Sequence, residues 1–109
     1  MAQDFERNFA NGVGTSASTL RTANSDDAIV GITICNVHTA QITVEVFVTN
    51  SSTDYHIVKD APIPVGSTLQ VLDGGAKIVL QSGDALKVKS SVNSSADVWV
   101  SAVDTISSD

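Results

Sequence analysis

Two histidines and a single cysteine are the side chains of this chain best suited to acid-base, nucleophilic or metal chemistry. His38 and His56 form no His-x-x-x-His pair, and no second cysteine joins Cys35 to complete a zinc ligand set. General acid-base catalysis needs a second positioned partner, which the spacing does not supply. Cys35 ends the apolar run that begins at Ile29, so we expect it to pack as a small hydrophobic residue. These observations predict that the protein is not an enzyme and has no catalytic residues.

Several glycine-containing segments could bind an ion or a phosphate. Asp73-Gly-Gly75 and Gly83-Asp84 combine carboxylates with tight turns, as calcium loops do. The alternating acids and closing glutamate of an EF-hand are absent, so we interpret both segments as turns. Gly12-Val-Gly14 lacks the further glycine and the following helix of a phosphate-binding loop. We therefore expect no metal-binding residues, no cofactor-binding residues and no cofactor.

The aromatic residues are few, and they are candidates for binding surfaces. Trp99 and Tyr55 are the large amphipathic aromatics, a residue type that often anchors contacts with proteins or sugars. Trp99 stands between two valines, so it faces away from them, either into a core or toward another subunit. No aromatic is near Trp99 in the sequence, which favours core or a subunit interface over a carbohydrate platform. Phe5 and Phe9 lie in a polar segment too short to form its own core. The candidate oligomer-interface residues are therefore Phe5, Phe9 and Trp99.

Composition and charge limit the possible partners. A length of 109 residues predicts one domain, and 42% hydrophobic with 17% charged residues predicts a folded chain. Twelve acidic and six basic residues give a net charge of -6, and the basic residues are scattered, so we expect no nucleic-acid partner. No apolar run approaches the ~20 residues of a membrane span, so we expect no membrane partner. The first residues lack the basic and apolar regions of a secretion signal, which predicts that the protein acts or assembles where it is made.

Period-two alternation of apolar residues dominates most of the chain and predicts strands. Residues 28–35 and 41–49 alternate most regularly, and the short connection between them predicts a hairpin. Val44 and Val46 are expected in the core, whereas Glu45 is expected on a wet outer face.

Shorter alternating runs follow, separated by Gly, Pro, Asn, Asp and Ser. A hairpin is expected across Asp73–Gly75, and Pro62 and Pro64 are expected at a sheet edge or corner. The expected fold is an all-β, single-domain antiparallel β-sandwich, jelly-roll-like, with about eight short strands. We place the β-sandwich domain at residues 12–109 and an N-terminal arm, extended or folded as a short docked helix, at residues 1–11. The predicted runs are residues 12–22, 28–35, 41–49, 55–59, 68–72, 77–80, 85–89 and 97–106.

The second half of the chain carries a family resemblance. Segments 55–66, 69–80 and 82–90, followed by the closing segment 97–103, resemble the small minor virion structural proteins of tailed bacteriophages, cyanophages included. The likeness covers about residues 27–106. It implies a virion component made in the cytoplasm of a bacterial host and added in many copies, as a capsid decoration or cement protein or as a neck or tail accessory protein. Its partners would be other virion proteins.

The resemblance and the aromatic residues leave two roles open. A structural subunit would form a homo-oligomer, for which we favour a trimer with contacts through Phe5 and Phe9. The alternative is a carbohydrate- or receptor-binding β-sandwich module of a phage tail or fibre, which needs an exposed aromatic patch around Trp99 or Tyr55.

Overall fold

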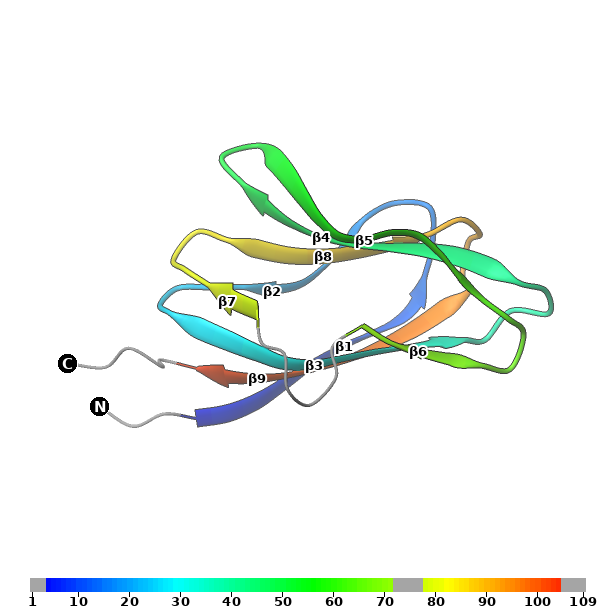
Figure 1. Ribbon diagram of the computed structural model, residues 1–109, viewed down its shortest axis with the longest axis horizontal. Helices are drawn as coiled ribbons and strands as arrows, with labels where there is room; N and C mark the ends of the chain where they lie inside the picture. The colour runs from blue at the N-terminus through cyan, green and yellow to red at the C-terminus, as the bar shows by residue number, and fades with distance from the viewer. Residues whose placement is uncertain (1–3, 72–77, 105–109) are drawn as a thin grey trace.

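Residues 4–71 and 78–104 are described by the computed structural model, and they form a two-layer β-sandwich of nine strands without a helix (Figure 1). Sheet A has the strand order β1-β9-β3-β6, and β7 also pairs with β3. Sheet B has the order β2-β8-β4-β5. The strands are β1 (Asp4–Val13), β2 (Ser18–Thr22), β3 (Asp27–Asn36), β4 (Ile42–Asn50), β5 (Thr53–Ile63), β6 (Thr68–Gln70), β7 (Ile78–Leu80), β8 (Ala85–Ser90) and β9 (Ala96–Asp104).

The strand pairs are nested from the ends of the chain toward its middle. β1 pairs with β9, β2 with β8, β3 with both β6 and β7, and β4 with β5, all antiparallel. Successive pairs alternate between the two sheets, so the chain is a long hairpin rolled into a sandwich, which is the jelly-roll arrangement. The predicted all-β jelly-roll-like sandwich is confirmed.

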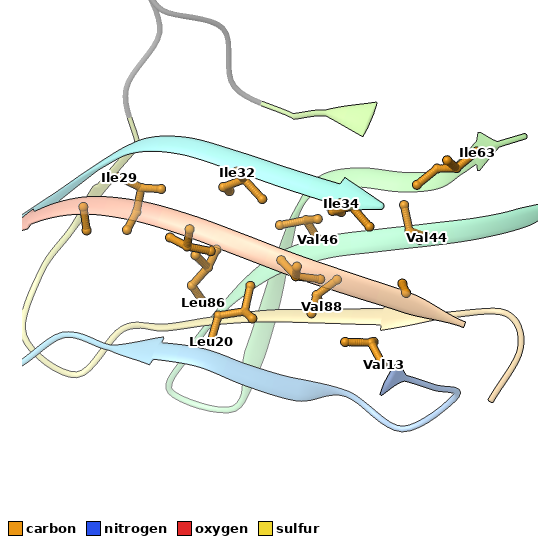
Figure 2. Packing of buried hydrophobic residues seen from close by; sticks show 14 of the residues in the cluster. Val13, Leu20, Ile29, Ile32, Ile34, Val44, Val46, Ile63, Leu86 and Val88 are labelled. Carbon is orange, nitrogen blue, oxygen red and sulfur yellow. The ribbon is translucent and has the colours of Figure 1, made fainter. Parts of the chain in front are cut away.

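The core lies between the two sheets and contains one side of each central strand. Figure 2 shows the isoleucines of β3 and the valines of β4 pointing into the same layer. Val44 and Val46 are 1% and 0% exposed, which confirms the predicted register of β4. The largest fully buried side chains are Ile29, Ile32, Ile34, Ile42, Ile63, Leu80, Leu86, Val13, Val44, Val46, Val88 and Val98.

A register shift in β3 changes which of its residues are buried. The pairing of β3 with β9 is irregular between Ile29 and Gly31. Ile29 and Ile32 both face the core, although simple alternation predicts opposite faces for them. The bulge adds one residue, Val30, and so reverses the alternation from one side of the bulge to the other.

Two predicted hairpins are wrong because their strands pair elsewhere. β3 belongs to sheet A and β4 to sheet B, so the connection between them crosses the sandwich. The Asn36 amide supports this crossing: its Nδ2 donates to the carbonyls of Ala40 at 3.0 Å and Ile63 at 2.9 Å, and its Oδ1 accepts from the His38 amide at 2.8 Å. Among the described residues, β6 and β7 do not pair with each other, because both pair with β3 at different positions.

The segment expected as a separate N-terminal arm is instead the edge strand β1 of sheet A. β1 pairs with β9 from Asp4 opposite Asp104 to Val13 opposite Ala96, so it crosses the expected boundary between residues 11 and 12. The extended form is therefore the one observed from residue 4, and the docked helix is not. Pairing with the last strand makes β1 part of the sandwich.

Candidate interaction face on sheet A

Two aromatic residues from opposite ends of the chain meet on the outer face of sheet A. Phe9 of β1 lies directly opposite Trp99 of β9, and their ring centroids are 5.2 Å apart with the planes tilted by 43°. Tilted aromatic pairs at this separation contribute about 0.5–1.5 kcal/mol beyond the area they bury. We call this surface, with Phe5, Phe9 and Trp99, the aromatic face.

The aromatic face is open in the isolated chain. Phe5, Phe9 and Trp99 are 86%, 57% and 51% exposed. The structure thus excludes the monomer core as the place of Trp99, and the subunit interface stays a prediction. Phe9 stands beside Trp99, so the surface has the neighbouring aromatic ring that the sequence around Trp99 lacks and that a sugar-binding surface needs.

A shallow pocket of about 340 Å³ lies beside the aromatic pair. Phe9 and Trp99 contribute to its wall, together with polar side chains that include Thr33 and Asp97. The Asp97 carboxylate is held in place because its Oδ1 accepts the Gly12 amide at 3.0 Å and Asn11 Nδ2 at 3.1 Å. The surface therefore offers apolar rings next to an anchored negative charge.

Arg7 adds a positive charge to the same face. Its guanidinium carbon lies 5.0 Å from the centroid of the Phe9 ring. A cation over an aromatic ring at an exposed site contributes about 0.5–1 kcal/mol. The contact holds the Arg7 charge close to the aromatic pair.

A partly buried ionic cluster fixes β1, the strand that carries two of the three aromatic residues. Arg21 of β2 reaches Glu6 Oε1 and Asp27 Oδ2, both at 2.9 Å, and its Nη1 donates to Asn8 Oδ1 at 2.9 Å. Asp104 Oδ1 lies 3.6 Å from Arg21 Nη2. We call Arg21, Glu6, Asp27 and Asp104 the Arg21 clasp. It joins β1, β2, β3 and β9 at one edge of the sandwich.

The centre of the clasp is shielded from water, whereas Glu6 and Asp104 reach the surface. The side chains of Arg21 and Asp27 are 9% and 1% exposed. Burial lowers the pKa of the Arg21 guanidinium, but hydrogen bonds and charges from Asp27 and Glu6 outweigh burial and raise the pKa above its ordinary value. Arg21 is therefore charged at every pH at which the fold is studied, and Asp27 depends on it as a partner.

The structure does not bring the two histidines together. His38 lies in the connection between β3 and β4, and His56 lies on β5. His56 Nε2 is 3.0 Å from Glu45 Oε1, and the ring centroids of His56 and Phe47 are 5.1 Å apart. Two lysines also lie close to the Glu45 carboxylate: Lys59 Nζ is 3.8 Å from Oε1, and Lys89 Nζ is 3.9 Å from Oε2. We expected Glu45 on a wet outer face, but its side chain is only 16% exposed and is held by these contacts.

The turns considered for calcium are only partly within the described residues. The Asp84 carboxylate accepts the Gln81 amide of its own turn at 2.9 Å and Nδ2 of Asn50, at the end of β4, at 2.5 Å. Asp73–Gly75 lies outside the described residues. Within residues 4–71 and 78–104, no three His, Cys, Asp or Glu side chains are grouped to hold a metal ion. The part of the chain that the structure describes also has no helix long and apolar enough to cross a membrane.

Comparisons with known proteins inform the fold. No family model matches the chain, and no curated protein matches it. A solved structure from the disulfide-linked pili of Bacillus endospore appendages is similar, with a TM-score of 0.56 and 15% sequence identity. The match covers 97% of this chain and 88% of that chain. At this identity the likeness supports the β-sandwich fold alone.

Proposed function

We propose that this protein is a structural subunit that acts by multi-copy assembly, packing its aromatic face against a neighbouring subunit. The observation that carries the proposal is the exposure of Phe5, Phe9 and Trp99 on one face of sheet A. Clustered exposed aromatics at the centre of a surface are typical of protein-binding sites, where they bury large areas with little loss of side-chain freedom. Catalysis is not part of the proposal.

The nature of the assembly is proposed from the sequence resemblance. Residues 27–106 resemble minor virion proteins of tailed phages, so we propose a virion location as a capsid decoration, neck or tail accessory protein made in the host cytoplasm. The fold shared with a chain of endospore pili agrees with a repeating structural role, because pili are also assemblies of many subunits. Other virion proteins are the proposed partners, together with copies of this chain. The trimer stays a prediction from sequence.

Replacing Trp99 by Ser is expected to weaken self-association about 30-fold or more, since a central aromatic of an interface contributes about 2 kcal/mol or more. Sedimentation velocity over a concentration series measures the change. Tyr55→Ser is the matched control, because Tyr55 is 60% exposed but lies on β5 of sheet B. Equal association of Trp99→Ser and the wild type would remove the aromatic face from the proposed function.

A carbohydrate- or receptor-binding module is the second candidate, favoured by one observation. The Phe9 and Trp99 rings stand beside a pocket with polar side chains, which together could stack a sugar ring and bind its hydroxyls. Trp99 is the only tryptophan, so its fluorescence reports on this surface alone. The test is a titration with host-surface glycans. A saturable change in fluorescence that is absent in Phe9→Ser would favour this candidate over the structural one.

A further inference from the structure

The charged residues of the aromatic face are placed on opposite sides of its aromatic row. Across the strands, Phe9 lies opposite Trp99, and Trp99 lies opposite Thr33 of β3, which defines the row. Arg7 is two residues before Phe9 on β1, opposite Ser101. Asp97 is two residues before Trp99 on β9, opposite Cys35. Since β1 and β9 run antiparallel, Arg7 and Asp97 lie on opposite sides of the row.

We propose that this face is self-complementary and binds a second copy of the chain about a twofold axis along the aromatic row. The inference rests on the proposed function and specifies its partner surface. Rotation about that axis places Trp99 over the partner's Trp99 and Phe9 over the partner's Phe9. The same rotation moves Arg7 to the side of the row where the partner's Asp97 lies, with a lateral offset of one strand spacing, roughly 4.8 Å, across the roughly 10 Å between facing sheets. The arginine and aspartate side chains together span that separation.

The arrangement of charges selects a second copy as the occupant. Two copies of a chain with a net charge of -6 repel each other, so association needs a local attraction at the contact. Each twofold contact forms two Arg7–Asp97 pairs between subunits, one on each side of the aromatic centre. The Asp97 carboxylate is already oriented by Gly12 and Asn11, and Arg7 is already held over Phe9, so both charges lose little freedom on pairing.

The contact also distinguishes the roles of the aromatics. Phe9 and Trp99 lie on the axis. Phe5 lies on β1 two residues farther from the axis than Arg7, opposite Val103 of β9. Phe5 therefore lies toward the rim. A twofold contact joins two copies, so it is compatible with a trimer only where two trimers meet through their aromatic faces.

A charge-exchange experiment on the full chain tests the proposal. Arg7→Glu and Asp97→Lys each turn both intersubunit pairs into like-charge contacts, so each variant alone is expected to dissociate about tenfold or more readily. In an equal mixture, the new carboxylate of the Arg7→Glu copy meets the new ammonium of the Asp97→Lys copy. The other pair in that mixed contact joins the unchanged Arg7 to the unchanged Asp97. The mixture should regain association near the wild-type level, measured by sedimentation velocity, and both pairs should weaken as salt is raised.

The controls separate this inference from the proposed function. Lys87→Glu on β8 of sheet B changes the net charge as Arg7→Glu does and should leave association unchanged. Asp97→Asn keeps an oxygen acceptor for Gly12 and removes only the charge, so it tests the pairing even if Asp97→Lys misfolds, and it should weaken association less than Asp97→Lys does. Mixed with Arg7→Glu, Asp97→Asn should regain less association than Asp97→Lys does, because the mixed contact then has a single Arg7–Asp97 pair. A mixture that stays dissociated while Trp99→Ser still abolishes association would overturn the twofold pairing and leave the proposed function standing. A wild-type chain that stays monomeric would overturn the twofold pairing outright.

Discussion

Val46→Asp is expected to abolish soluble folding. Val46 lies in the middle of β4, is 0% exposed and belongs to the core between the sheets (Figure 2). An unpaired carboxylate there must either lose its hydration or take up a proton, and the methyl contacts are lost as well. A loss of about 4 kcal/mol or more is comparable with the whole stability of a small domain. Soluble yield and the circular dichroism melting curve measure the effect.

Val65→Asp is the matched control for this substitution. It introduces the same carboxylate in place of the same residue type, at a turn position that is 57% exposed. We expect a change of within about 0.5 kcal/mol there. If both variants melt alike, or if Val46→Asp folds normally, the register of β4 is wrong by one residue.

Arg21→Met is expected to destabilise the fold by about 3–5 kcal/mol, because it leaves the carboxylate of Asp27 buried without the guanidinium. Asp27 as a residue is 0% exposed, so water cannot replace the guanidinium without local opening. The free energy of unfolding from a denaturant titration gives the size of the effect. Hydrogen exchange should show the largest loss of protection in β1, since Glu6 and Asn8 are held by the same guanidinium.

Two further variants identify the cause. Arg7→Met makes the same substitution at an arginine of the outer face and should have little effect on unfolding. The double variant Arg21→Met with Asp27→Leu removes the buried carboxylate together with the guanidinium, so it should recover much of the lost stability. No recovery in the double variant would mean that Arg21 acts through Glu6 or Asp104 rather than through Asp27.

The central strands are predictable from the sequence because their alternation reports burial on one side. In β4, Val44 and Val46 are buried, and in β8, Leu86 and Val88 are buried, as the pattern predicts. The pattern does not report which strand pairs with which. A short connection predicts a hairpin of β3 with β4, but the connection crosses between the sheets, and the hydrogen bonds of Asn36 support it there.

The candidate site is only partly predictable, because its contacts join distant parts of the chain. The sequence singles out Phe5 and Phe9, yet β1 has no continuous apolar inner face to mark it as a strand. Its inward residues Glu6 and Asn8 are polar because they face Arg21. The sequence around Arg21 does not indicate its role in the clasp, because Glu6 and Asp104 come close to it only when the chain is folded.

The pairing of the first described strand with the last has a consequence for how the chain folds. β1 completes its ladder only when β9 is available, so this part of sheet A cannot close until β9 has left the ribosome (Figure 1). Folds dominated by such distant pairings form in about milliseconds to seconds, more slowly than helical proteins of similar size. During synthesis Phe9 has no Trp99 to stack on. The surface that we propose for assembly therefore forms only after β9 has been made and has paired with β1, which delays association until then.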